Sequence, residues 1–268
     1  MKKYLKIGAI LLAFAIIAFV LSFGNSLTGN PVSKNLANKN AKVYIKENYA
    51  DYDLIIDDAF YDFKMVNSYV ISVKSETIED LYFSVYYDML GNLIRDNYEN
   101  LIIGGQNTMY RLNMEYMSEC KNIFATLENS DMFKDCESFF ASGWLWETEQ
   151  IDNLSNTFKM EFTGGIETNT LQLDKNYDMS ELGEVAGVLD VSVRFLDKDT
   201  SFERGAEALR EIKQVFEEQN LKFKYITFGV FNEEGNFAWD APYFSYDDIE
   251  SEDLVEILYE YSKKSIER

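Results

Sequence analysis

Histidine is absent from the chain, and few other features of the sequence exclude so many enzymes. Without imidazole, the chain cannot activate a nucleophile through a Ser–His or Cys–His pair, and it cannot bind zinc through histidine. It also lacks the side chain that ordinarily titrates between about pH 5 and 8. The two cysteines are too few for a four-cysteine zinc site. A hydrolase based on a pair of carboxylates remains open, since two acids can share general acid and base roles without histidine.

Two interpretations of Cys120 and Cys136 remain open from the sequence. In an oxidising compartment they could form a disulfide that closes a loop of about 15 residues and contributes about 3 kcal/mol. Cys120 also falls on the apolar stripe of a predicted helix, where a buried thiol is common. The sequence favours neither.

Positive charge is scarce, since 25 basic residues face 46 acidic ones and the formal charge is −21. Residues 131–268 alone carry a net charge of −18. Such a domain repels phosphate backbones, so we expect no nucleic-acid partner. Solubility explains the charge most simply, and affinity for cations or for a basic partner is the alternative.

One long hydrophobic run, from Ile7 to Phe23, follows the basic start MKKYLK. This pattern predicts a single transmembrane helix, with the N-terminus cytoplasmic and the C-terminal body extracytoplasmic. The membrane, bound through residues 7–23, is thus the first expected partner. A cleaved signal peptide is the competing interpretation, with Ser22 and Gly24 as the small residues around the cleavage position. The run is longer than a usual signal core of about 7–15 residues, which favours the anchor.

The remainder predicts an α+β protein of two small domains, residues 34–130 and 131–268. Residues 1–23 would be the cytoplasmic stub and anchor, and the turn-prone residues 24–33 a tether. The first domain combines a helix from Ser33 to about Tyr49, an antiparallel meander and a second helix. Alternating apolar residues place the strands of the meander in Leu54–Phe63, Tyr69–Val73, Leu81–Tyr87 and Leu93–Ile94. The stripe of the second helix contains Met109, Leu112, Tyr116, Met117, Cys120, Ile123, Phe124 and Leu127.

The second domain mixes strands and helices, including a long helix in the C-terminal half of the chain. A capping box at Thr200–Glu203 precedes this helix, which ends near Asn220. A short helix from Ser180 to Ala186 is expected to stop at Gly187. The final helix begins near Glu252. Strands are expected at Phe139–Trp146, Thr168–Leu173, Val188–Leu196 and in a hairpin of Phe223–Phe231 with Asn236–Trp239.

Three groups of residues along the chain resemble the YfjL-like family, which is described as small membrane-anchored proteins of Gram-positive bacteria. The groups are Asn107-Thr108 with Arg111-Leu112 and Glu115-Tyr116; Tyr177-Asp178 with Glu181-Leu182-Gly183 and Ala186-Gly187; and Phe244, Tyr246, Asp248-Ile249 and Leu254-Val255-Glu256. The resemblance covers nearly the whole chain. It implies no catalytic residue, because the family has no assigned activity.

The densest acidic cluster surrounds the start of the final helix, and Asp247, Asp248 and Asp253 are its candidate metal ligands. Calcium would suit such oxygen ligands. Anions at a helix N-terminus also have a structural explanation, because they offset the helix dipole. We favour the structural explanation, and we expect no cofactor and assign no catalytic residue.

The sequence therefore favours a non-catalytic binding or interaction module at the cell surface, with an unidentified protein partner. The alternative is a carboxylate-dependent hydrolase that acts on cell-envelope material. A cleft lined by two or more buried acids with raised pKa values would favour the hydrolase. A shallow apolar surface or an open sheet edge would favour the binding module.

Overall fold

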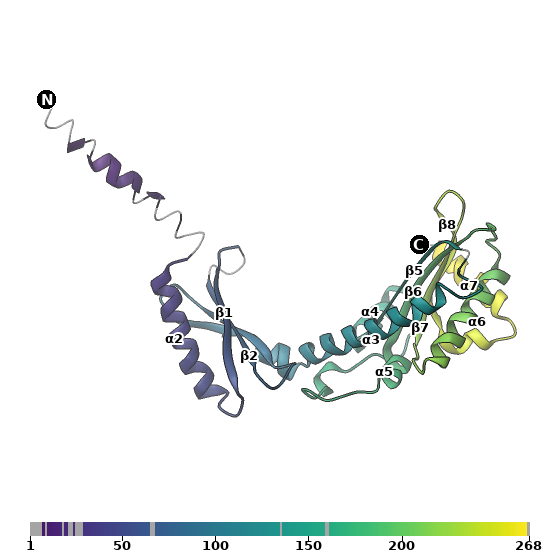
Figure 1. The fold of residues 1–268 in the computed structure, drawn as a ribbon, viewed down its shortest axis with the longest axis horizontal. Helices are drawn as coiled ribbons and strands as arrows, with labels where there is room; N and C mark the ends of the chain where they lie inside the picture. Colours follow the sequence, from purple (N-terminus) through teal and green to yellow (C-terminus); the bar gives the residue numbers. More distant parts are fainter. Residues whose placement is uncertain are drawn as a thin grey trace. The chain divides into compact units, whose positions relative to one another are not determined.

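The computed structural model describes residues 7–8, 10–17, 19–20, 24, 29–64, 68–134, 136–158 and 161–266 (Figure 1). The chain divides into two compact units. The first comprises residues 1–107 with 172–174, and the second comprises residues 108–171 with 175–268. Each contains helices and a four-stranded sheet, so the α+β class predicted from the sequence is confirmed.

The prediction of a transmembrane helix at residues 7–23 is wrong, because no helix among the described residues is both long and apolar enough to cross a membrane. Residues 9, 18 and 21–23 lie outside the described residues. The predicted localisation across a membrane rested on this helix and is corrected with it, while the predicted membrane contact through residues 7–23 stays an untested prediction.

In the first unit, helix α2 (Pro31–Asn48) begins earlier than the predicted Ser33 and overlaps the predicted tether. Asn30 is the N-cap, since its side-chain oxygen accepts a hydrogen bond from the backbone N–H of Val32 at 2.8 Å. Pro31 occupies the first helical position, where its missing N–H costs nothing. The helix therefore starts at an Asn-Pro pair.

The sheet of the first unit is the predicted antiparallel meander, in the order β1-β2-β3-β4. Its strands are β1 (Leu54–Asp62), β2 (Ser68–Ser75), β3 (Tyr82–Tyr87) and β4 (Leu93–Asp96), and a short π-helix, η1 (Glu99–Ile103), follows. Alternate residues of β2, such as Ile71 and Val73, are buried in one core with Ala37 and Ala41 of α2. The small alanines let α2 lie close against this face of the sheet.

Helix α3 (Gln106–Leu127) has the apolar stripe that the sequence predicted, apart from the exposed Met117. The stripe packs into the core of the second unit, where Leu112, Tyr116 and Cys120 are completely buried. The division between the units therefore precedes most of α3, whereas the sequence placed the domain boundary after residue 130.

The sheet of the second unit has the order β5-β6-β7-β8. Strands β6 and β7 are parallel because α6 connects them, and the other pairs are antiparallel. Helices α3, α6 and α7 share one core with one face of the sheet, while α4 packs with Val188 and Tyr225 of the opposite face. The elements are β5 (Cys136–Leu145), α4 (Thr148–Phe158), η2 (Thr168–Thr170), α5 (Met179–Ala186), β6 (Gly187–Phe195), α6 (Phe202–Glu218), β7 (Tyr225–Phe231), β8 (Phe237–Ser245), η3 (Tyr246–Glu250) and α7 (Leu254–Ile266).

Three local predictions differ from this structure. The strand predicted at Thr168–Leu173 is wrong, since the chain forms only the short turn η2 there. The N-cap of α6 is Ser201, one residue after the predicted Thr200, and its hydroxyl accepts a hydrogen bond from the N–H of Arg204. Gly187 ends α5 as predicted, but its φ of −69° is an ordinary one. Glycine is needed there because a Cβ would lie 2.4 Å from the Tyr116 hydroxyl.

Candidate functional site

A groove of about 620 Å³ runs between α2 and β1 in the first unit, and we call it the helix–strand groove. Its α2 side is lined by Lys42, Ile45 and Lys46, and its strand side by Leu54–Ile56. Tyr49, Ala50 and Tyr52, between the helix and the strand, line its end. No residue of β2 lines it, so the groove follows the edge of β1 that faces away from β2. Along that edge β1 has no strand partner among the described residues.

The groove combines apolar and basic side chains. Leu54 and Ile56 are half-buried and pack against the core under α2. Lys42 and Lys46 are exposed on α2, and neither forms an ion pair in the described part of the chain. No acidic residue lines the groove. Lys42 and Lys46 are therefore the charged side chains among the residues that line the groove.

A cluster of tyrosines surrounds Asp96 of β4, and one of them, Tyr49, also lines the groove. The hydroxyls of Tyr44 and Tyr49 both donate to the same carboxylate oxygen of Asp96, the second at 2.8 Å. The other oxygen accepts from the backbone N–H of Tyr98 at 3.2 Å. The ring centroids of Tyr49 and Tyr98 are 4.4 Å apart, and Phe83 lies 5.0 Å from Tyr49 in an edge-on contact. These contacts fix the end of α2 to the sheet.

Burial is the main cause of raised tyrosine pKa values in this cluster. It raises the pKa values of Tyr44 and Tyr49, and their hydrogen bonds to Asp96 raise them further. Burial also raises the pKa of Tyr87 to about 12. The phenols therefore remain neutral donors at physiological pH.

A β-bulge limits the open edge of β1. The register with β2 shifts between Ile56 and Asp58, which leaves Asp57 in the bulge. Asp57 forms an ion pair with Lys74 at 2.5 Å, and the Asp58 side chain accepts from the N–H of Ala59 at 2.7 Å. Bulges and charges at a sheet edge oppose indiscriminate strand pairing. The edge available to a partner is therefore the short segment Leu54–Ile56.

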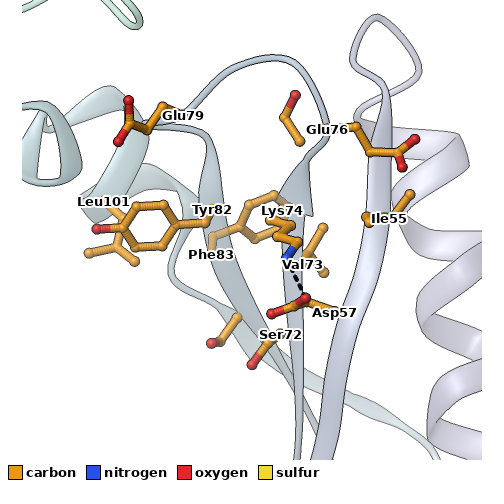
Figure 2. Close-up of a pocket in the computed structure, with 12 residues that line it drawn as sticks. Ile55, Asp57, Ser72, Val73, Lys74, Glu76, Glu79, Tyr82, Phe83 and Leu101 are labelled. Carbon is orange, nitrogen blue, oxygen red and sulfur yellow. Dashed lines mark ion pairs between the residues drawn. The ribbon is translucent and has the colours of Figure 1, made fainter.

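A second hollow, of about 850 Å³, lies over strands β1–β3 of the first unit, and Figure 2 shows its lining. The ion pair of Lys74 with Asp57 crosses it, and Tyr82 lies on the β3 side. Glu76 and Glu79 add negative charge from the β2–β3 loop. Both members of the ion pair are about half-exposed, so the pair contributes at most about 1 kcal/mol. The hollow offers no unpaired cation and no buried acid.

The candidate metal ligands lie near the start of α7, as the sequence placed them. Asp247 and Asp248 belong to η3, and Asp253 immediately precedes α7. The N–H of Asp247 donates to the Ser245 hydroxyl, and the N–H of Asp253 donates to that of Ser251. Among the described residues, no group of three acids, cysteines or histidines is placed to hold a metal ion.

The arrangement expected of a carboxylate hydrolase is not found in the two hollows of the first unit described above or in a third hollow of the second unit. Burial raises the pKa values of Glu119, Asp190 and Asp248, but none of these acids lines the helix–strand groove or the hollow over β1–β3. A third hollow, of about 160 Å³ in the second unit, is lined by Glu137 and Glu233. Each pairs with a cation at 3.1 Å.

Cys120 is a buried free thiol and is not bridged to Cys136. Burial raises the pKa of the Cys120 thiol to about 12. A Cβ on Gly143 of β5 would lie 2.6 Å from its sulfur, so helix and strand are in close contact at this position. The structure thus supports the thiol interpretation, with Cys120 as a small core residue.

Three of the residues behind the family resemblance, Asn107, Tyr116 and Gly183, have structural roles in packing and hydrogen bonding. The Asn107 side chain donates to the carbonyls of Asp80 and Tyr82 at 2.8 and 2.7 Å. The Tyr116 hydroxyl donates to the carbonyl of Lys222 at 2.7 Å, and a Cβ on Gly183 would lie 2.0 Å from that same oxygen. These positions require their residue types for packing and hydrogen bonding.

The fold and the groove define a two-unit α+β protein whose described residues include an open groove between a helix and an edge strand. The chain belongs to the YfjL-like family: the YfjL-like N-terminal domain matches residues 1–98, and the YfjL-like C-terminal domain matches residues 145–259. No curated protein matches it. The crystal structure of a DUF5037 family protein from Ruminococcus gnavus aligns with 82% of this chain and 86% of its own, at 14% identity and a TM-score of 0.21. So low a TM-score carries no argument about fold or function.

Sequence reasoning did not identify the helix–strand groove. It identified α2 and β1, but no pattern in one sequence says that the lysines of a helix lie beside the open edge of a particular strand. The feature of the sequence that could have indicated the groove is the composition of α2, which has four lysines and one glutamate in an otherwise acidic chain.

Proposed function

We propose that the protein is a non-catalytic interaction module that binds an extended polypeptide segment of a partner in the helix–strand groove. The observation that supports this most directly is the open edge of β1 at Leu54–Ile56, with the flank of α2 beside it. An added strand gains main-chain hydrogen bonds from such an edge, and its side chains gain specificity from the adjacent groove.

The bulge at Asp57 supports a short and selective contact. A partner segment can pair with the residues before the bulge, while the charges beyond it disfavour continued pairing. The same device discourages two copies of β1 from joining edge to edge. A groove of this kind suits a defined segment of a partner better than open-ended sheet extension.

The tyrosine cluster supports a groove that exists before its partner arrives. Asp96 joins two tyrosines at the end of α2 to β4, so the helix flank is held in place in the free protein. A preformed site loses less conformational entropy on binding. The hydrolase alternative receives no comparable support, because no two acids with raised pKa values share a hollow described above.

A peptide selection with the full chain tests the proposal. Random peptides displayed on phage are selected on the wild-type protein, and the affinities of the selected peptides are then measured. Ala50 is exposed and lines the groove, so Ala50→Trp should fill the groove and weaken binding at least about tenfold. Val43→Trp is the matched control, because Val43 is exposed on α2 but does not line the groove.

Binding that is lost in Ala50→Trp and retained in Val43→Trp supports the groove as the site. Selection of no peptide, or affinities equal in the two variants, contradicts the proposal. Near-ultraviolet circular dichroism checks that both variants retain the packing of the aromatic side chains.

A further inference from the structure

We infer that the segment bound in the helix–strand groove is acidic and places carboxylates at alternate positions against Lys42 and Lys46. This inference rests on the proposed function and names the chemistry of its partner. The groove supplies two ammonium groups that have no ion-pair partner in the described part of the chain, and no carboxylate lines it. An extended acidic segment is complementary to it in charge, whereas a basic segment would be repelled.

The spacing of the two lysines fits an extended chain. Residues four apart on a helix rise by about 6 Å along its axis. Alternate residues of a strand, which point to the same side, are about 6.6 Å apart. Lys42 and Lys46 therefore match two side chains on one side of an extended segment that lies along α2.

Helix and strand lie side by side over their lengths, as this match requires (Figure 1). At one end, Tyr49 and Leu54 line the same groove. At the other end, the Tyr69 hydroxyl donates to the carbonyl of Asn30 at 2.9 Å, and the ring of Tyr69 lies 5.1 Å from that of Tyr61 near the end of β1. A segment paired with β1 thus runs along the helix, not across it.

The apolar part of the lining adds a second requirement. Ile45 is buried, and Leu54 and Ile56 are half-buried, at the base of the groove. Carboxylates alone would leave these surfaces exposed to water. The fitting segment therefore combines acidic residues with aliphatic ones, which fill the groove while the carboxylates reach the ammonium groups at its margin.

Defined peptides test the chemistry on the full chain. The probe is a fluorescein-labelled peptide in which glutamates alternate with valines over about six residues, a common strand length. Peptides with glutamine or lysine in place of glutamate are its matched analogues. We expect the glutamate peptide to bind by fluorescence anisotropy, the glutamine peptide to bind about tenfold more weakly, and the lysine peptide not to bind.

Charge reversal on the protein provides the second arm. The double variant Lys42→Glu/Lys46→Glu should lose about tenfold or more in affinity for the glutamate peptide, while Lys42→Arg/Lys46→Arg should retain it. Lys34→Glu/Lys39→Glu is the control, since these lysines lie on the same helix outside the groove. Added salt should weaken the glutamate complex and leave the glutamine complex nearly unchanged.

The outcomes separate this inference from the proposed function. Equal affinity of glutamate and glutamine peptides, with both lost in Ala50→Trp, overturns the acidic chemistry and leaves the groove as a binding site. Equal losses in the two charge-reversed variants show non-specific attraction to α2 and also overturn it. Self-association of the free chain that depends on Lys42 and Lys46 assigns the groove to a second acidic copy, against the inference. No binding that is sensitive to Ala50→Trp removes both proposals.

Discussion

Removal of the Asp96 carboxylate should loosen the end of α2 and destabilise the first unit. Asp96 accepts hydrogen bonds from the hydroxyls of Tyr44 and Tyr49 and from the N–H of Tyr98. A hydrogen bond to a charged group contributes about 1.5–3 kcal/mol, but the half-buried hydroxyls regain some water in the variant. We therefore expect Asp96→Ala to lower the free energy of unfolding of the first unit by about 3 kcal/mol. Asp96→Asn, which keeps an acceptor, should cost less.

The position of the tryptophans makes the effect measurable unit by unit. All three, Trp144, Trp146 and Trp239, lie in the second unit. In urea unfolding, tryptophan fluorescence reports the second unit, while far-ultraviolet circular dichroism reports both. Asp96→Ala should shift the dichroism transition and leave the fluorescence transition in place. The control, Asp51→Ala, removes an exposed carboxylate of the same unit and should shift neither.

A loss below about 1 kcal/mol in Asp96→Ala would refute this reasoning, because it would mean that the carboxylate is no better than water for the tyrosines. A shift confined to tryptophan fluorescence would refute it as well.

The pH dependence of stability gives an independent check. The folded-state pKa values of Tyr44 and Tyr49 are raised, and that of Tyr87 is raised to about 12. Stability from these groups is fully present below about pH 10, where unfolded tyrosine ionises, and is lost as the pH rises further.

Three other predictions concern the second unit. Gly183→Ala should destabilise this unit by about 3 kcal/mol, since the new Cβ would clash with the carbonyl oxygen of Lys222. Urea unfolding monitored by tryptophan fluorescence measures the loss, and an unchanged unfolding midpoint would contradict the close packing at Gly183. In the native protein, Cys136, which is half-exposed, should react with a thiol reagent, whereas Cys120 should resist it. The Cys120 thiol is buried, and burial raises its pKa to about 12. Equal labelling rates of the two cysteines, measured by mass spectrometry, would refute this prediction. Calcium and sodium at equal ionic strength should give the same melting temperature, and a calcium-specific rise lost in Asp248→Asn would reveal a metal site.

Much of the fold could be predicted from the sequence because its elements have clear periodicities. The stripe of α3 and the alternation in β2 and β3 each identify one buried face, and burial of that face is what the structure shows. Contacts between residues far apart in the sequence were harder to predict. The helical stripe of α3 says that one face is buried, but it does not say that Tyr116 reaches the carbonyl of Lys222 and so joins α3 to the second unit.

The error at residues 7–23 has a different origin. An apolar run supplies the hydrophobicity of a membrane span, but composition alone does not test whether a helix is long enough, and none among the described residues is both long and apolar enough. The strand predicted at Thr168–Leu173 failed for a related reason, since short polar segments carry little periodicity. The groove was missed because it depends on the placement of α2 beside the open edge of β1.

Hydrogen–deuterium exchange of the full chain, with and without a bound peptide, tests the central claim most directly. We expect slower exchange of the backbone amides in Leu54–Ile56 when the peptide is bound, since an added strand would pair with that edge. Exchange in the hollow over β1–β3, at Ser72 and Ser84, should remain unchanged. Protection confined to Ser72 and Ser84 or to the second unit, with Leu54–Ile56 unaffected, would contradict the helix–strand groove as the binding site.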